Sequence, residues 1–325
     1  MAGMGKRMRP HTLTIPKPLI PIAGKPIVQR LVEGIVAVCE EKVDEIAFII
    51  GDFGDQVESD LLEVAKNLGA NGKIYHQEEA LGTAHAVYCA AESLEGKIVV
   101  AFADTLFYAD FTLDESKDGI VWVQKVDDPS HFGVVLLDND GVIVEFVEKP
   151  EKFISDLAII GIYYFKSGEN LKEEIQYLID NKITEKGEYQ LTNALENMKN
   201  KGKKFFAGKV DEWLDCGNKN ATVNTNNRVL AREGSNIEND VRREDSVIID
   251  PCFIGKGVLL KRTIVGPHVS IGDGSILENV VVENSIIQKH TKVTNVCLNN
   301  SMIGNNVDYN GSRNEVSIGD FNQIS

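Results

Sequence analysis

Glycines and basic residues near the amino terminus form the part of the chain best suited to chemistry. Gly3 and Gly5 stand close to Arg7, and Pro16-Lys17-Pro18 follows shortly after. Glycines let the backbone approach a ligand closely and turn its N–H groups toward an anion. Arginine and lysine add full positive charge, and the flanking prolines limit the entropy lost when Lys17 is held in place. This combination predicts a polyphosphate-binding site.

The same segment resembles the opening signature of the sugar-1-phosphate nucleotidylyltransferases. That signature runs roughly G-x-G-x-R-x-x-P, then P-K-P-L-x-P, then G-K-P. The matching residues keep its order and are Gly3, Gly5, Arg7, Pro10, Pro16-Lys17-Pro18-Leu19, Pro21 and Gly24-Lys25-Pro26. The resemblance implies an α/β fold class: a Rossmann-like, GT-A-like nucleotidyltransferase domain with a mixed sheet, followed by a short left-handed β-helix.

The reaction implied by the resemblance joins a nucleoside triphosphate to a hexose 1-phosphate and releases pyrophosphate. A sugar-phosphate oxygen attacks the α-phosphorus, and because a phosphate dianion is already a nucleophile, no general base is required. Catalysis then rests on positioning and on charge neutralisation by Mg²⁺ and cationic side chains. We therefore expect Mg²⁺ as the cofactor, with a nucleoside triphosphate and a sugar 1-phosphate as partners.

Four residues would carry this catalysis by resemblance to the family: Arg7, Lys17, Asp104 and Asp215. Asp104 follows an apolar run, and Asp215 lies in Trp-Leu-Asp-Cys-Gly. The two carboxylates would bind Mg²⁺, which takes few hard oxygen ligands and lets phosphates complete its shell. Arg7 would hold the β- and γ-phosphates, and Lys17 would reach the α-phosphate and the sugar phosphate. The family usually has glycine before the first aspartate, where this chain has Ala103.

Further segments match the substrate-binding parts of the family. The nucleotide is expected at Ala2, Gly3, Gly5, Gln77 and Gly82. Gln77 and the Gly82 backbone would pair with the edge of a pyrimidine. The sugar phosphate is expected at Gly133, Glu148 and Lys149, with Glu148 on sugar hydroxyls and Lys149 on the phosphate. We expect His85 to be a helical residue near the site, and Trp213 to pack at the sheet edge or in the nucleotide pocket.

The sequence is compatible with several related pairs of nucleotide and sugar 1-phosphate. Residues 81–86 are similar to the N-acetylglucosamine-1-phosphate uridylyltransferases, and residues 213–217 to the glucose-1-phosphate thymidylyltransferases. Ile159-Ile160-Gly161 lacks the asparagine that usually contacts an acetamido group. We favour glucose 1-phosphate with dTTP or UTP, as in a glucose-1-phosphate thymidylyltransferase. The alternatives are an N-acetylglucosamine-1-phosphate uridylyltransferase, a mannose-1-phosphate guanylyltransferase and a non-catalytic regulatory paralogue.

Composition excludes several other classes of protein. The formal charge of −15 on 325 residues argues against general nucleic-acid binding, which depends on neutralising phosphates. The sequence has no apolar run long enough for a transmembrane helix and no signal-peptide pattern, so no membrane partner is expected. Five widely spaced cysteines without a C-x-x-C pair indicate reduced thiols in a cytoplasmic protein and argue against a zinc site.

Alternating apolar runs and amphipathic segments up to Asp104 predict a parallel sheet with crossover helices. Gln77, Gly82 and Asp104 then fall beyond the carboxyl ends of strands, where ligands bind in such sheets. The pattern becomes strand-rich between residues 120 and 165. Expected strands are 46–50, 73–76, 98–102, 120–126, 134–137, 142–147, 158–165 and 203–207. Expected helices start at residue 26 and then cover 55–68, 84–93, 170–179, 190–200 and 218–233, closing a catalytic domain of residues 1–235.

Family members place a short apolar strand before the glycine loop, whereas this chain has almost nothing ahead of Gly3. That strand would be central in a parallel sheet, so its absence would leave neighbouring strands unpaired. We expect the first strand to be missing from the catalytic domain, through a start assigned at an internal methionine or through truncation.

An imperfect six-residue rhythm follows residue 235. Aliphatic residues precede glycine at Ile254, Val265, Ile271, Ile303 and Ile318, with Leu260 and Leu277 in phase. Residues 245–325 resemble the left-handed β-helix of hexapeptide-repeat proteins, in which each short side inserts one apolar residue into the core. The alternative fold is a small β-sandwich. We expect the β-helix to support a homo-oligomer; an acyltransferase that uses His268 and His290 is the alternative role.

Overall fold

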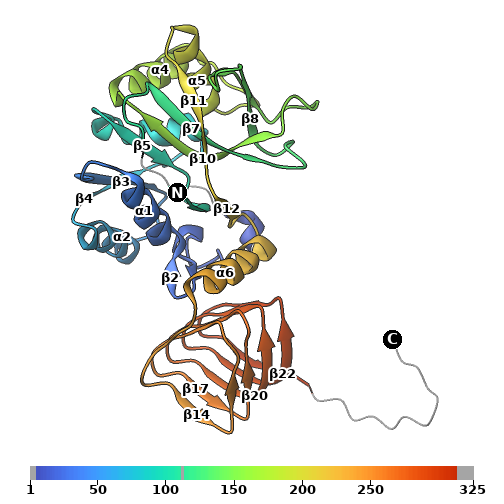
Figure 1. Cartoon of the computed structure of the whole chain (residues 1–325). Helices are drawn as coiled ribbons and strands as arrows, with labels where there is room; N and C mark the ends of the chain where they lie inside the picture. The colour runs from blue at the N-terminus through green and yellow to red at the C-terminus, as the bar shows by residue number, and fades with distance from the viewer. Residues whose placement is uncertain (1–4, 111–112, 313–325) are drawn as a thin grey trace, which may run out of the picture. The chain divides into compact units, whose positions relative to one another are not determined.

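The computed structural model describes residues 5–110 and 113–312. The chain divides into two units. The first contains Met1–Ile20 and Ile27–Gly217, and the second contains Pro21–Pro26 and Asn218–Ser325 (Figure 1). Within the described residues, every helix is too short or too polar to cross a membrane.

The larger sheet of the first unit is mixed. Strand β10 runs antiparallel to β5, β7 and β8, whereas β11 runs parallel to β7. Almost every residue of β10 is buried, as expected of a strand covered on both faces. The strands are β5 (Ile98–Ala101), β7 (Gly119–Lys125), β8 (Gly133–Leu137), β9 (Ile143–Glu148), β10 (Leu157–Phe165) and β11 (Phe205–Lys209).

Three helices share a core with this sheet: α3 (Thr83–Tyr88), α4 (Gly168–Asp180) and α5 (Leu191–Asn200). Their apolar residues, such as Val87, Ile175 and Leu195, contact the cluster around Val123 and Phe165. The sequence prediction of a helix over 84–93 is partly wrong, because α3 ends at Tyr88 and a short 3-10 turn, η3 (Ala91–Ser93), follows.

A second, two-stranded parallel sheet contains β3 (Glu45–Ile50) and β4 (Asn71–His76). Helices α1 (Ile27–Val38) and α2 (Asp55–Asn67) contribute to its core through Val28 and Leu61. Among the described strands, β3 pairs only with β4 and β5 pairs only with β10, so each has one edge without a paired strand. The expected missing strand concerns residues outside the described range and stays a prediction.

A two-stranded antiparallel ribbon completes the first unit. It consists of β6 (Thr105–Tyr108) and β12 (Glu212–Asp215), with Asp215 opposite Thr105. The sequence did not predict either strand, although Thr-Leu-Phe-Tyr and Glu-Trp-Leu-Asp contain the β-branched and aromatic residues that favour strands. This ribbon brings two distant parts of the chain together.

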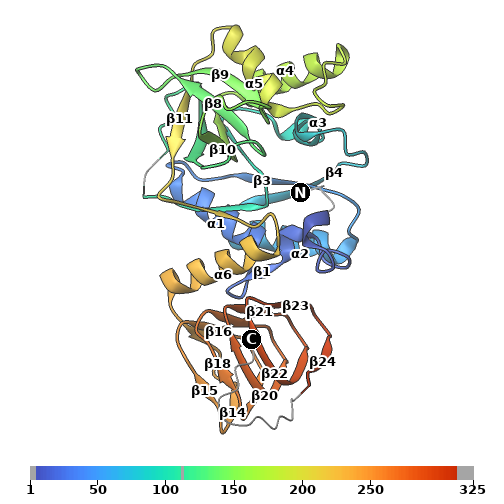
Figure 2. The same cartoon turned by 90° about the vertical axis from the view of Figure 1, so that its right-hand side faces the viewer.

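The second unit contains a hairpin, a helix and a β-solenoid. The hairpin is formed by β1 (Pro21–Ile22) and β2 (Lys25–Pro26), and the helix is α6 (Lys219–Glu233). All strand pairs described in the solenoid are parallel and stack coil on coil (Figure 2). A small antiparallel β-sandwich is thereby excluded, and the predicted solenoid is confirmed; its left-handedness stays a prediction. Its strands are β13 (Asn236–Ile237), β14 (Arg242–Glu244), β15 (Val247–Ile248), β16 (Cys252–Ile254), β17 (Leu259–Lys261), β18 (Ile264–Val265), β19 (Val269–Ile271), β20 (Ile276–Glu283), β21 (Ser285–Ile287), β22 (Lys292–Asn299), β23 (Met302–Ile303) and β24 (Asp308–Asn310).

The coil length explains why the six-residue rhythm slips. Hydrogen bonds between stacked coils join residues 17 apart at Arg262 and Asn279, but 16 apart at Asn279 and Asn295. Each coil is therefore shorter than three complete six-residue sides. Corner residues such as Asn279 and His290 have positive φ angles, where asparagine is tolerated better than most residues. The predicted inward residues among those described include Ile254, Leu260, Val265, Ile271 and Leu277, all fully buried; Ile318 lies outside the described residues.

Candidate active site

The sequence-predicted cation Lys17 lies beside the sequence-predicted acid Asp104. The Lys17 Nζ is 2.9 Å from the Asp104 Oδ2, and Lys17 is only 9% exposed. Lys17 opens the 3-10 turn η2 (Lys17–Leu19), where Pro16 and Pro18 restrict its backbone. A lysine this buried needs an anionic partner. Because the Asp104 side chain is 46% exposed, the pair is reachable by a ligand.

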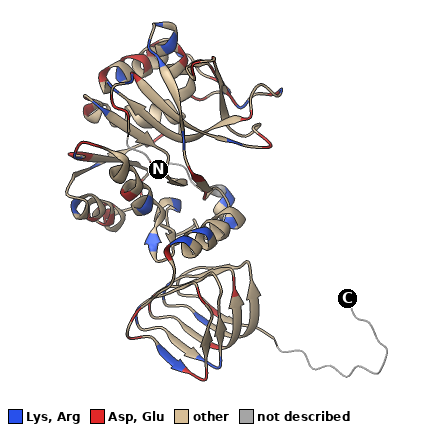
Figure 3. Cartoon of the chain, in the orientation of Figure 1, with Lys and Arg blue, Asp and Glu red and all other residues tan. Residues whose placement is uncertain are grey.

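Asp215 reaches the same place through the β6–β12 ribbon. The Cys216 N–H donates to the Asp104 carbonyl oxygen over 2.9 Å, and the Gly217 N–H donates to the Asp215 Oδ1 over 2.8 Å. These bonds hold the two aspartates at adjoining strand ends. Figure 3 marks the acidic residues of the ribbon in red.

The electrostatic surroundings of Asp215 include all the other predicted catalytic residues. Burial raises the pKa of its carboxyl, and the negative charge of Asp104 raises it further. The Gly217 N–H, and then Lys17 and Arg7, act in the opposite direction on that pKa. Arg7 itself is exposed. An acid pair in which one carboxyl resists ionisation is an arrangement that a bound divalent cation relieves.

The donor set at these strand ends fits Mg²⁺. The carboxylates of Asp104 and Asp215 lie close enough for the charge of one to affect the ionisation of the other. In the described part of the chain, no group of three histidine, cysteine, aspartate or glutamate side chains could hold a metal. Mg²⁺ is commonly bound through one or two carboxylates, with phosphates and water supplying the other oxygens. Asp104 and Asp215 are therefore the residues that would hold Mg²⁺.

The predicted base-recognition residues form a second group. Gln77 follows β4 and is 9% exposed, and its Nε2 lies 3.2 Å from the Gly82 carbonyl oxygen and 3.1 Å from the His85 Nδ1. Gly82 has a φ of 114°, and a Cβ there would lie 2.4 Å from the Tyr189 carbonyl oxygen. Only glycine fits this turn without displacing the neighbouring backbone. His85 is a helical residue of α3, as predicted.

The predicted sugar-phosphate residues form a third group. Gly133 in β8 lies opposite Glu148 in β9, and a Cβ on Gly133 would lie 3.1 Å from the Glu148 Oε2. The Lys149 Nζ is 3.2 Å from the Glu148 Oε1. Nearby, burial raises the pKa of the Tyr163 hydroxyl, and the Glu148 charge adds to this rise. Tyr163 is thus kept protonated beside the carboxylate.

The segment from Tyr189 to Thr192 was missed by sequence reasoning, although it joins the second and third groups. The Tyr189 N–H donates to the Leu81 carbonyl oxygen over 2.8 Å, and the Ala84 N–H donates to the Tyr189 carbonyl oxygen over 2.9 Å. Three residues further on, the Thr192 hydroxyl donates to the Glu148 Oε2 over 3.2 Å. Gln190 and Thr192 are nearly buried polar residues at the start of α5. A polar pair in the first turn of an amphipathic helix was the available signal.

Two predicted nucleotide residues, Ala2 and Gly3, lie outside the described residues. Gly5 is described and has a φ of 53°, and its carbonyl oxygen accepts hydrogen bonds from the Met8 N–H and the Thr12 hydroxyl. Trp213 packs at the ribbon, where its Nε1 donates to the Thr105 hydroxyl and its ring meets Phe132 edge-on at 5.4 Å.

A family model described as nucleotidyl transferase matches residues 1–232. The bifunctional protein GlmU of Methanococcus vannielii is 31% identical over 337 residues, covering 95% of this chain and 77% of that protein. A glucose-1-phosphate thymidylyltransferase of Streptomyces antibioticus is 29% identical over 331 residues, covering 94% of this chain and 90% of that protein. A solved UDP-glucose pyrophosphorylase complexed with UDP-glucose shares the fold, with a TM-score of 0.59 and 24% identity over 71% of this chain and 97% of that chain.

Proposed function

The chain belongs to the nucleotidyl transferase family, and we propose that it joins a pyrimidine nucleoside triphosphate to glucose 1-phosphate with release of pyrophosphate. One observation carries the proposal: Asp104 and Asp215 adjoin at the ends of one ribbon, with Lys17 bonded to Asp104. Two acids and a buried lysine meet there, which suits the neutralisation of phosphate charge.

The proposed roles follow from charge and access. Asp104 and Asp215 would hold Mg²⁺, which when bound supplies positive charge to the phosphates. Lys17, whose ammonium is paired with Asp104 in this structure, would turn to the α-phosphate and the sugar phosphate and neutralise charge that develops on them. Arg7, being exposed, is free to contact the β- and γ-phosphates.

The base and the sugar would bind at the second and third groups. Gln77 and the Gly82 backbone would pair with a pyrimidine edge, which dTTP and UTP share. Ile159 and Ile160 are buried, and Gly161 faces the Phe102 ring. This apolar stretch offers no amide to an acetamido group, which supports glucose 1-phosphate over N-acetylglucosamine 1-phosphate. The five cysteines are free thiols, which supports the proposed cytoplasmic location.

The second candidate is transfer of UMP to N-acetylglucosamine 1-phosphate. It is favoured by the 31% identity to the bifunctional protein GlmU and by residues 81–86. Gln77 and Gly82 would serve this reaction equally well, so the two candidates differ only in the sugar pocket.

A matrix of substrates tests the proposal. Each of dTTP, UTP, GTP, CTP and ATP would be combined with the 1-phosphates of glucose, N-acetylglucosamine and mannose in Mg²⁺, with pyrophosphate release as the readout. We expect glucose 1-phosphate with dTTP or UTP to give the highest kcat/KM. A preference for N-acetylglucosamine 1-phosphate would establish the second candidate, and no pyrophosphate from any pair would contradict catalysis. Acetyl-CoA with glucosamine 1-phosphate tests the acyltransferase alternative.

A further inference from the structure

The hairpin that directly follows the catalytic lysine belongs to the second unit. The chain leaves the first unit after Ile20, forms the hairpin Pro21–Pro26, and returns at Ile27. The Ile27 N–H donates to the Ile20 carbonyl oxygen over 3.1 Å and closes the base of this excursion. The hairpin turn is thus linked covalently to Lys17 by only a few residues.

The turn of the hairpin is fastened by a buried asparagine on α6. Asn226 is fully buried, and its Oδ1 accepts hydrogen bonds from the Ala23 N–H at 3.0 Å and from the Ser270 hydroxyl at 2.6 Å. Its Nδ2 has no hydrogen-bond partner among the described residues. Because an unpaired buried donor costs free energy, the acceptor oxygen is the part of this side chain that stabilises the structure.

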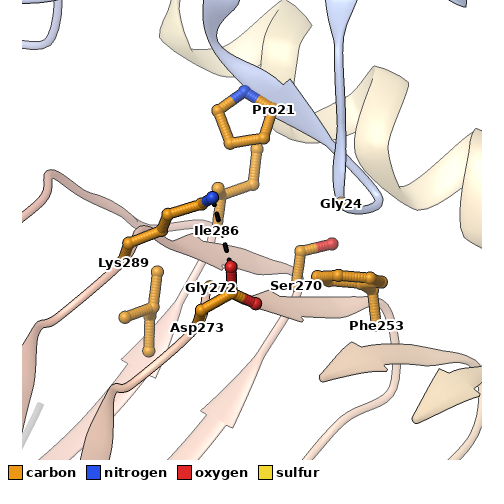
Figure 4. A pocket seen from close by; sticks show the side chains of 9 residues that line it. Pro21, Gly24, Phe253, Ser270, Gly272, Asp273, Ile286 and Lys289 are labelled. Carbon is orange, nitrogen blue, oxygen red and sulfur yellow. Dashed lines mark ion pairs between the residues drawn. The ribbon is translucent and has the colours of Figure 1, made fainter. Parts of the chain in front are cut away.

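The same turn packs against an aromatic ring of the solenoid. A Cβ placed on Gly24 would lie only 2.2 Å from the Phe253 ring, so glycine is required for the close approach. Figure 4 shows the turn over Phe253 and Ser270, beside the ion pair that Lys289 makes with Asp273 at 3.1 Å. Hydrogen bonds and ring packing therefore both hold the hairpin on the solenoid.

The link from the hairpin to Lys17 is stiff. Pro16 and Pro18 flank the lysine, and the Leu19 and Ile20 N–H groups donate to the Pro16 and Lys17 carbonyl oxygens at 2.9 and 3.1 Å. Proline restricts φ, and these bonds restrict the residues between. A displacement of the turn is consequently passed along the backbone instead of being absorbed.

We propose that Asn226 is a positioning residue for catalysis, which sets the place of the Lys17 ammonium by fastening the hairpin to the solenoid. This inference rests on the proposed function of Lys17. It gives the solenoid a part in the reaction that requires no contact with substrate, since a small misplacement of a catalytic group lowers the rate strongly.

A double-mutant cycle separates positioning from simple stability. Asn226→Leu removes the acceptor while keeping the number of side-chain heavy atoms, and Ser270→Ala removes one of its donors. The matched control is Ser275→Ala, a buried solenoid serine whose hydroxyl bonds the Gln288 carbonyl oxygen. We expect kcat to fall about tenfold in Asn226→Leu and severalfold in Ser270→Ala, and to change less than twofold in the control.

The decisive arm combines Asn226→Leu with Lys17→Met. If Asn226 acts through Lys17, it has no further effect on kcat once Lys17→Met has lowered it. Multiplicative losses in the double variant, or an unchanged kcat in folded Asn226→Leu, would overturn the inference alone. A wild-type kcat in Lys17→Met would instead overturn the proposed function of that residue.

A second pair keeps the inference testable if Asn226→Leu does not fold. Gly24→Ala places a Cβ against the Phe253 ring and strains the positive φ of the turn, and Phe253→Ala removes the ring that packs on the turn. We expect a loss of kcat in each of these single variants. Unchanged kcat in both variants would contradict the proposed positioning.

Discussion

The ribbon β6–β12 and the solenoid differ in the surroundings of their buried polar groups. In the solenoid, buried hydroxyls are bonded to neighbouring backbone: Ser275 donates to the Gln288 carbonyl oxygen, and Thr291 donates to that of Gly304. At the ribbon, Asp215 is partly buried with a raised pKa beside a second carboxylate. These solenoid hydroxyls are bonded within the coils, whereas the ribbon brings together two carboxylates of like charge, which we propose a divalent cation neutralises.

This difference separates stability from function. Each coil of a solenoid is stabilised by its contacts with the neighbouring coils, and these contacts do not depend on a substrate. An acid pair costs free energy in the empty protein and regains it when a cation binds. Substitutions at the ribbon should therefore change activity more than stability, and substitutions in the solenoid core should do the reverse.

The largest effect is expected at the ribbon. Asp104→Asn and Asp215→Asn keep side-chain size but remove negative charge, so each should lower kcat at least about a hundredfold. Circular dichroism and thermal unfolding would show that the fold is retained. Wild-type rates in both variants would remove these residues from the proposed metal site.

The solenoid core should respond in the opposite sense. Leu277 is fully buried, so Leu277→Ala should cost about 3 kcal/mol of unfolding free energy. Urea denaturation would measure this, and the KM values of the folded protein should stay the same. The neighbouring Ile276, which is partly exposed in the same strand, provides the control Ile276→Ala. Equal costs for the two variants would contradict the assigned core.

The hydrogen bond between Thr192 and Glu148 should have an intermediate effect on activity. Thr192→Val removes the hydroxyl that bonds Glu148, which is worth about 1.5 kcal/mol for a charged acceptor and thus raises KM for the sugar 1-phosphate by about tenfold. Thr192→Ser keeps the hydroxyl and should behave as wild type. A rise in KM for both variants would show that the methyl group matters instead.

An added strand would test whether the open strand edges of the first unit limit its thermal stability. In the described residues β3 and β5 each keep an edge without a paired strand, whereas solenoid strands stack on one another. Five or six apolar residues appended before Met1 should raise Tm by about 4 °C if they pair there. The control is an appended segment of equal length made of glycine and serine. Equal Tm values for the two extensions would contradict the expectation.

The smallest effect concerns the pH dependence of stability. Since the pKa of Asp215 is raised in the folded protein, the folded state binds this proton more tightly than the unfolded state. Asp215 therefore favours folding at acidic pH and opposes it as the pH rises through the folded pKa. Without metal or nucleotide, Asp215→Asn should have a higher Tm than the wild type at neutral pH. This difference in Tm should vanish at a pH below the ordinary pKa range of aspartate. A Tm difference between Asp215→Asn and the wild type that does not change with pH would contradict the raised pKa of Asp215.

The sequence predicted local structure better than it predicted contacts between distant parts of the chain. The helices α2, α4, α5 and α6 begin and end within a few residues of their expected limits, and α1 begins one residue after its expected start, because amphipathic spacing and caps are local signals. The ribbon was missed because its pairing joins residues such as Thr105 and Trp213, which are 108 positions apart. No local pattern encodes such a partner.

The candidate site shows the same limit. The resemblance brought Asp104 and Asp215 to attention, but only the ribbon shows how they adjoin. The segment Tyr189–Thr192 was absent from the predicted site, because its hydrogen bonds join residues 81–84 and Glu148, which lie far away in sequence. Asn226 is an ordinary helix residue in sequence, and only its buried contact with Ala23 distinguishes it.

Mn²⁺ binding in the presence of dTTP, followed by water-proton relaxation, tests the central claim most directly, because the enhancement reports metal held on the protein. The account predicts one Mn²⁺ per chain in the wild type, with affinity about tenfold weaker or worse in Asp104→Asn and in Asp215→Asn. The same enhancement and affinity in both variants would show that the two carboxylates hold no metal, which would contradict the account.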